Sequence, residues 1–309
     1  MKQRARNYAF FLLVAIGAGR RAHAANLIVN CDKHESIHKA LRLLASTNPQ
    51  GPNTITVSGT CKGNFVIQSM DRLTLITKKG ASITDRSNGS RSVVDIEDSR
   101  GVTVQGFTIN GGSWGVLCST ASVCHLTGNT IQDGGTGVGM FFGSQAFLES
   151  NVIQNNGGRG SMVNDGSRMF SSDDVFRGNA AQGIAVLSGS LFEATNSSFL
   201  NNAIGVEAGV ATVQLRGGTI SGSVGDGMKL LGNSSGVFAG PTITGNGGVG
   251  VHLEDGAFGG FLAASITGNL SGLDIDCAPQ LPITRFVDRT GGITNCIEPA
   301  SKSQLKAAE

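Results

Sequence analysis

The stretch Val123-Cys124-His125-Leu126-Thr127-Gly128-Asn129-Thr130-Ile131 contains the pattern that decides the fold. Cys124 and Leu126 alternate with polar residues, which predicts a strand with one buried face. Gly128-Asn129 then predicts a tight bend. Ile131 is the apolar residue that a second, short strand after this bend would bury. Because the same pattern returns along the chain, this stretch predicts one unit of a repeat.

The repeat has a period of 22 to 23 residues, and two independent series of residues follow it. A long periodic series is the signature of a solenoid. An antiparallel sandwich needs hairpin turns and strands at 8–12-residue spacing, and it would not keep a 22-residue phase over so long a stretch. The bulky members are Ile109, Ile131, Ile153, Phe176, Phe199, Ile220, Ile243 and Ile266. The glycine members are Gly115, Gly137, Gly160, Gly183, Gly205, Gly227, Gly250 and Gly272.

Each period predicts one coil with three strands. An alternating strand follows the series glycine, as in Gly250-Val251-His252-Leu253. A single coil cannot bury its apolar residues, whereas stacked coils bury them in a continuous column. We therefore predict an all-β parallel β-helix of about ten coils.

The ends of the chain predict its organisation. Residues 1–24 have the basic start, short apolar run and Ala22-His23-Ala24 site of an export signal. Residues 25–53 are expected to form an N-terminal cap with a short helix, 54–277 the β-helix, and 278–309 a C-terminal cap and tail. One face of the helix is marked by Ile37, Ala40, Leu41 and Leu44. The interpretation places the protein in the periplasm or outside the cell, without a transmembrane segment after signal removal.

Charge excludes nucleic acid as a partner. Removing the signal takes five of the 24 basic residues and leaves 19 against 22 acidic ones, so the mature chain lacks a basic footprint.

Six cysteines suit an oxidising compartment. Their order along the chain suggests three local pairs, although six cysteines allow about fifteen pairings, and Cys118 and Cys124 could instead be free buried thiols. The suggested pairs are Cys31 with Cys61, Cys118 with Cys124, and Cys277 with Cys296.

The repeat pattern Gly-Val-x-Leu, Val-x-Leu, Gly-Asn-x-Ile resembles the right-handed parallel β-helix repeats of the pectate lyase-like superfamily, over residues 26 to 277. The resemblance implies the fold. It implies no single activity, because the superfamily contains lyases, hydrolases, epimerases, tailspikes and adhesins. In its enzymes, the outer face of the strand after the series glycine often carries the catalytic groups.

On that strand we expect an outward column made of Glu207, Lys229, His252 and Asp274, with Glu254 and Asp276 beside it. If the protein is a polysaccharide lyase, Lys229 or His252 is the candidate base and carboxylates hold Ca²⁺. Alternating charges also stabilise a solvated strand face without any chemistry, and we favour this interpretation.

Few aromatic residues are available to stack on sugar rings, and Trp114 and Phe141 are the candidates, with Glu254 as a polar contact. Phe141, Met162, Leu187 and Leu231 are expected to project outward as an apolar patch.

Two further motifs are interpreted as structural. His34-Glu35-Ser36-Ile37-His38 spells the zinc-peptidase pattern, but it lies where the cap should be, so no metal site is expected. Asn129, Asn151 and Asp174 precede the bulky series by two positions, which predicts an asparagine ladder with Asp174 as a structural member.

The leading interpretation is an exported β-helix with a structural or binding role at the cell envelope or outside the cell, and a polysaccharide as its expected partner. The alternatives are a polysaccharide lyase, a less favoured hydrolase, and an oligomeric adhesin that pairs through the apolar patch.

Overall fold

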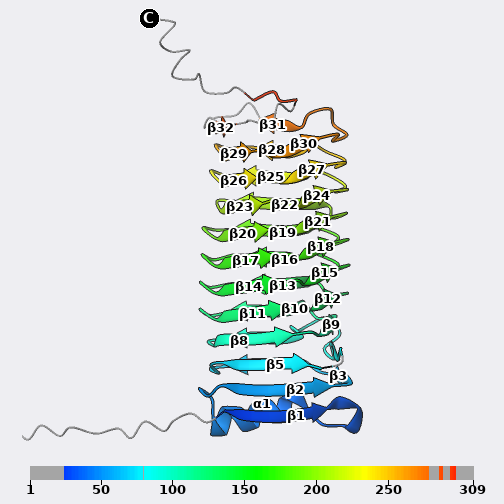
Figure 1. Ribbon diagram of the computed structural model, residues 1–309, viewed down its shortest axis with the longest axis vertical. Coiled ribbons are helices and arrows are strands. Elements are labelled where there is room, and N and C mark those ends of the chain that lie inside the picture. The colour runs from blue at the N-terminus through cyan, green and yellow to red at the C-terminus, as the bar shows by residue number, and fades with distance from the viewer. Residues whose placement is uncertain (1–23, 79, 278–284, 288–292, 297–309) are drawn as a thin grey trace, which may run out of the picture.

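The chain folds into a straight tube of stacked coils (Figure 1). The computed structural model describes residues 24–78, 80–277, 285–287 and 293–296. Each strand inside a sheet pairs in parallel with its equivalents in the coils before and after it, and each end strand pairs with one, so the predicted parallel β-helix is confirmed.

Sheet 1 has twelve strands. They are β1 (Ala25–Asn30), β2 (Asn53–Ser58), β5 (Leu73–Thr77), β8 (Arg100–Gln105), β11 (Val123–Thr127), β14 (Gln145–Glu149), β17 (Arg168–Ser172), β20 (Leu191–Thr195), β23 (Thr212–Arg216), β26 (Ser235–Ala239), β29 (Phe258–Leu262) and β32 (Arg285–Val287).

Sheet 2 has ten strands, and the series glycines lie at the start of its strands or directly before them. They are β4 (Phe65–Gln68), β7 (Val94–Glu97), β10 (Trp114–Ser119), β13 (Thr136–Met140), β16 (Ser161–Val163), β19 (Gln182–Leu187), β22 (Ile204–Gly209), β25 (Met228–Leu231), β28 (Val251–Leu253) and β31 (Ile275–Cys277).

Sheet 3 also has ten strands, and all of them are short. They are β3 (Thr60–Lys62), β6 (Ser82–Thr84), β9 (Thr108–Asn110), β12 (Thr130–Gln132), β15 (Val152–Gln154), β18 (Val175–Arg177), β21 (Ser198–Leu200), β24 (Thr219–Ser221), β27 (Thr242–Thr244) and β30 (Ser265–Thr267).

The N-terminal end of the tube is covered by α1 (Ile37–Thr47), which follows the short 3₁₀ helix η1 (Cys31–Lys33). The face predicted from the sequence is the buried one, with Ile37, Ala40, Leu41 and Leu44 packed on the core. The cap region also contributes β1, which pairs with β2 as the first strand of sheet 1. In the part of the chain that the structure describes, no helix is long and apolar enough to cross a membrane.

The bulky series lies inside the tube in strict register. Ile131 pairs with Ile153, Ile153 with Phe176, and Phe176 with Phe199. All four are buried, and the rings of Phe176 and Phe199 stack 4.9 Å apart. Full burial of such a side chain stabilises the fold by about 1.5–3 kcal/mol, so the column holds the coils together.

The series glycine is required by close approach of the next coil. A Cβ on Gly183 would lie 2.6 Å from the carbonyl oxygen of Gly205, and a Cβ on Gly137 would lie 2.5 Å from that of Gly160. A side chain does not fit there without displacing the next coil, which explains why glycine recurs from Gly115 to Gly250.

Polar ladders occupy the bends. Asn129 Nδ2 donates to Asn151 Oδ1 at 3.0 Å, and Asn151 Nδ2 donates to Asp174 Oδ1 at 2.9 Å. The predicted ladder is confirmed. Burial raises the pKa of Asp174, although hydrogen bonds from Ser171 and Asn151 oppose the shift.

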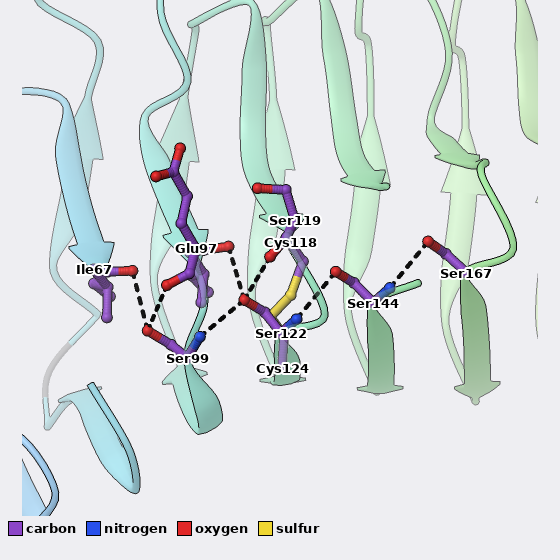
Figure 2. Close-up of a disulfide and its surroundings, with 10 residues drawn as sticks. Ile67, Glu97, Ser99, Cys118, Ser119, Ser122, Cys124, Ser144 and Ser167 are labelled. Atoms are coloured by element: carbon purple, nitrogen blue, oxygen red, sulfur yellow. Dashed lines mark hydrogen bonds between the residues drawn. A yellow bond between two sulfur atoms is a disulfide. The ribbon is translucent and has the colours of Figure 1, made fainter. Parts of the chain in front are cut away.

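A serine ladder that the sequence reasoning did not identify runs along the turn between sheets 2 and 1 (Figure 2). The backbone N–H of Ser99 donates to Ser122 Oγ at 3.1 Å, and that of Ser122 donates to Ser144 Oγ at 3.2 Å. Each rung therefore satisfies a buried donor of the coil before it.

All three suggested disulfides are present: Cys31–Cys61, Cys118–Cys124 and Cys277–Cys296. Cys118 and Cys124 are buried and join β10 to β11 beside the serine ladder (Figure 2). The predicted signal at residues 1–24 and the predicted C-terminal cap and tail lie almost entirely outside the described residues.

Candidate functional site

The outer face of sheet 2 carries the predicted charged column. Val206, Met228 and Val251 point into the core, so the residues after them point outward. Glu207 on β22 lies in register with Lys229 on β25, and Lys229 lies in register with His252 on β28.

The fourth member of the column is Asp276 and not Asp274, which corrects the prediction. His252 pairs with Asp276 because β31 begins at Ile275. The last coil is 24 residues long from Val251 to Ile275, so the series position passes from Gly272 to Asp274. Asp274 is only 7% exposed, and its Oδ2 accepts the backbone N–H of Ile293 at 3.0 Å. It is a structural residue of the last turn.

Ion pairs connect the upper half of this face. Lys229 Nζ lies 3.5 Å from Glu254 Oε2, and the same carboxylate oxygen lies 3.6 Å from His252 Nε2. On its other side, His252 Nδ1 lies 3.4 Å from Asp226 Oδ2. Side chains of these four residues are 21–29% exposed, so they form a half-buried network that is open to solvent. We name it the charged cluster: Asp226, Lys229, His252 and Glu254.

Asp226 is the member that the sequence reasoning missed. It lies in the turn before β25, where its Oδ1 accepts the backbone N–H of Val249 at 3.0 Å. Burial acts to raise the pKa of Asp226, but the hydrogen bond from His252 and the backbone bond outweigh it and lower the pKa. Its position in an Asp-Gly turn before a strand resembles several other turns, so nothing in the sequence distinguished it.

The hydrogen bond to Asp226 raises the pKa of His252, and this effect exceeds the opposing effect of burial. His252 is therefore held as a cation to higher pH than a free histidine. A general base must be unprotonated to accept a proton, and the interaction with Asp226 favours the protonated form of His252. Lys229 is held by Glu254 in the same network.

Glu207 and Asp276 lie at the margins of the cluster. Gln182 Nε2 donates to Glu207 Oε2 at 2.9 Å, and Asn295 Nδ2 donates to Asp276 Oδ1 at 2.6 Å. Among the described residues, both carboxylates have amide partners, and neither lies within ion-pair distance of a cation. The predicted alternation of charge is not observed, because Lys229 and His252 are neighbours in the column, and the ion pairs link them to Glu254 and Asp226 instead.

Within the described ranges, no group of three or more His, Cys, Asp or Glu side chains is placed to hold a metal ion. In the zinc-peptidase motif, His34 has a φ of 63° and precedes α1, whereas His38 is helical. The two histidines therefore do not lie one turn apart on a helix, as that motif requires.

Trp114 and Phe141 lie in contact on the outer face of sheet 2, nearer the N-terminal end of the tube than the charged cluster. Their rings meet edge to face with centroids 5.2 Å apart. The indole covers Gly139, since a Cβ there would lie 2.6 Å from the ring. Phe142 continues the group, with its side chain 65% exposed. We name this group the aromatic platform: Trp114, Phe141 and Phe142.

Between the aromatic platform and the charged cluster the face is apolar. Met162 lies in register with Ala185, and Leu187 with Gly209, which is followed by Leu231. The three large side chains are half-buried. Self-association through this patch stays a prediction.

An isolated carboxyl lies toward the N-terminal end of the same face. Asp95 on β7 pairs with Leu117 on β10. Burial, followed by repulsion from Glu97, raises the pKa of Asp95 to about 6. Asp95 Oδ1 is buried without a hydrogen-bond partner among the described residues. The outer face of sheet 2 therefore contains a carboxyl group that stays protonated to a higher pH than an ordinary aspartate.

The sequence matches the family model described as right-handed beta helix region, over residues 26–211 and again over 175–280. A comparison with curated protein sequences finds no match.

Solved structures share the fold. The A-module of mannuronan C-5 epimerase AlgE6 from Azotobacter vinelandii has a TM-score of 0.63 and 13% identity, covering 88% of this chain and 96% of the module. Pectate lyase Pel9A has a TM-score of 0.57 and 13% identity, covering 79% of this chain and 77% of the lyase. The A-module of AlgE4, from the same bacterium, has a TM-score of 0.51 and 13% identity over 82% and 95%. At such identities the likeness extends to the fold alone.

Proposed function

Because the chain belongs to the family of right-handed β-helix proteins, we propose that it is an exported protein that binds a polysaccharide along the outer face of sheet 2 and does not cleave it. One observation carries the proposal. The aromatic platform and the charged cluster lie on the same outer face, on strands of one sheet.

The separation of the two groups fits a polymer. Trp114 lies on β10 and Lys229 on β25, five strand spacings apart in sheet 2. At about 4.8 Å per spacing they lie about 24 Å apart along the tube. A single sugar cannot contact both groups, whereas a chain of several sugars laid along the tube can.

Each group supplies one component of carbohydrate recognition. The partly exposed rings of Trp114 and Phe141 offer apolar area with little conformational freedom to lose. Sugar hydroxyl groups can donate hydrogen bonds to the carboxylates of Glu254 and Asp226 and accept them from the ammonium of Lys229. Hydrogen bonds to charged groups contribute about 1.5–3 kcal/mol each.

Binding without cleavage is supported by the state of the candidate bases. Asp226 favours the protonated form of His252, and Lys229 is paired with Glu254. The choice of a polysaccharide is supported by two of the structural neighbours, a pectate lyase and a mannuronan epimerase. Three disulfides support a periplasmic or extracellular location.

Affinity electrophoresis tests the proposal, with polygalacturonate, alginate or a neutral β-glucan cast into the gel. We expect at least one polymer to retard the protein, and Trp114→Ala and Lys229→Ala to weaken that retardation at least tenfold. Phe147→Ala is the matched control, because Phe147 is 37% exposed on sheet 1, away from this face.

The same mixtures are followed for unsaturated sugar products by ultraviolet absorbance. Product formation that disappears in Lys229→Ala or His252→Ala would establish the lyase alternative instead. Retardation that is equal in wild type and both sheet 2 variants, or absent with every polymer, contradicts the proposed surface.

A further inference from the structure

A hollow lies at the N-terminal end of the tube, remote from the charged cluster. It has a volume of about 590 Å³ and lies between the start of α1, the β3–β4 turn and the loop after β6. Its lining includes four basic side chains and no acidic one. We name it the basic pocket, after His38, Lys62, Arg86 and Arg91.

The loop that carries both arginines is held in shape by Asp85. Its Oδ1 accepts the Ser87 hydroxyl at 2.7 Å and Asn64 Nδ2 at 2.7 Å, and its Oδ2 accepts the N–H of Gly89 at 2.6 Å. Burial acts to raise the pKa of Asp85, but these hydrogen bonds outweigh it and hold the pKa far below its ordinary value. The Asp85 carboxylate therefore holds the loop in shape, and it does not itself line the pocket.

Asn64 and Ser87 connect that anchor to the pocket wall. Asn64 Oδ1 accepts the backbone N–H of Arg86 at 3.2 Å, and Ser87 Oγ accepts that of Arg91 at 2.9 Å. The backbones of Arg86 and Arg91 are thus fixed while their side chains remain exposed. Among the described residues, none of the four basic side chains of the pocket has an acidic partner within ion-pair distance.

The adjoining hollow, of about 500 Å³, shares Lys62 and Arg86 and adds two carboxylates. Both are already engaged by the backbone. Asp32 Oδ1 accepts the N–H of Thr60 at 3.0 Å, and Glu35 Oε2 accepts that of Asn30 at 2.6 Å. Among the described residues, neither carboxylate lies within ion-pair distance of Lys62 or Arg86.

The start of α1 adds a smaller contribution. Ser36 and His38 line the pocket, and the side chain of Ser36 makes no capping hydrogen bond. The partial positive charge of a helix N-terminus favours an anion by about 0.3–1 kcal/mol.

We propose that the basic pocket binds an oxyanion, a carboxylate or sulfate group carried by a ligand of about the size of one or two sugar rings. Arginine guanidinium groups match the planar geometry of a carboxylate and the oxygens of a sulfate. A volume of 590 Å³ lies within the range of about 300–1,000 Å³ that small-molecule pockets occupy. This proposal does not rest on the proposed function, since it concerns the other end of the tube.

Isothermal titration calorimetry with the oxidised protein tests it, using sodium sulfate, sodium glucuronate and glucose as probes. We expect sulfate or glucuronate to bind with an affinity that falls as salt rises, and glucose not to bind. The double variant Arg86→Gln/Arg91→Gln should weaken binding at least tenfold, and Lys62→Gln should weaken it severalfold. Arg216→Gln is the matched control, an exposed arginine on sheet 1 that should leave affinity unchanged.

The relative affinities of the two anions identify the source of the oxyanion, since glucuronate also offers a sugar ring. Circular dichroism confirms that the variants are folded. Absence of binding for both anions, or equal affinity in wild type and the double variant, would overturn the proposal. Loss of polysaccharide retardation in the sheet 2 variants leaves this result unaffected, so the two proposals fail separately.

Discussion

Replacement of Gly183 by alanine tests whether close approach of neighbouring coils determines the repeat. The added Cβ would lie 2.6 Å from the carbonyl oxygen of Gly205 and 2.8 Å from Asn202 Nδ2. Observed Cβ contacts essentially never fall below 3.0 Å, so two coils must separate locally. The backbone of Gly183 does not have a positive φ, and the cost is therefore steric.

The magnitude follows from two contributions. Overpacking a close contact costs about 1–3 kcal/mol, and weakening the hydrogen bonds of the Asn202 rung costs about 1 kcal/mol more. We expect a loss of about 2–4 kcal/mol in the free energy of unfolding. For a chain of this size that corresponds to a fall in Tm of roughly 4–8 °C, at about 2 °C per kcal/mol.

Gly157→Ala is the matched control. It also lacks a positive φ, but its nearest contact for a Cβ is the carbonyl oxygen of Gly134 at 3.6 Å, an ordinary distance. This variant should match wild type or gain up to about 1 kcal/mol from the restricted unfolded chain. Thermal and urea unfolding are followed by far-ultraviolet circular dichroism. If Gly183→Ala unfolds at the same midpoint as Gly157→Ala, the steric explanation of the glycine series is wrong.

Three other perturbations probe individual side chains. Asp174→Ala should lower the free energy of unfolding by about 2–5 kcal/mol, since it leaves two donors of Asn151 unpaired. Asp174→Asn keeps an acceptor and removes a buried charge, so this variant should be at least as stable as wild type at neutral pH. Asp95, with its pKa raised to about 6, contributes stability that is complete below its ordinary pKa and lost as pH rises through 6. Urea midpoints of Asp95→Asn should therefore exceed those of wild type more at pH 7.5 than at pH 4, and an equal difference at both would contradict the shift. His252 should titrate by NMR above the usual histidine range, and Asp226→Asn should lower its pKa; an unchanged titration would show that Asp226 does not set it.

The sequence predicted the tube, its period, the helical plug and the disulfides because each follows from local or strictly periodic information. The bulky series and the glycine series both reflect direct contact between equivalent residues of adjacent coils, so register follows from period. The ladder of Asn129, Asn151 and Asp174 was predictable for the same reason.

The prediction was wrong where the period changes. Asp274 was placed in the outward column because Gly272 continues the glycine series by count, but the last coil is two residues longer than 22 and Asp276 takes that place. Asp226 was missed because its link to His252 crosses from a turn to the next coil. The pairing of Arg86 and Arg91 around one hollow depends on a loop shaped by the hydrogen bonds of Asp85, which no spacing rule indicates.

The fluorescence of Trp114 tests the central claim most directly, because it is the only tryptophan in the chain and lies in the proposed binding face. Titration with the polysaccharide that retards the protein should change its emission saturably and reduce quenching by acrylamide. In Lys229→Ala, whose altered residue lies about 24 Å away along sheet 2, the same change should require at least tenfold more ligand. Emission and quenching that stay constant while the polymer binds would place the ligand elsewhere and contradict the account.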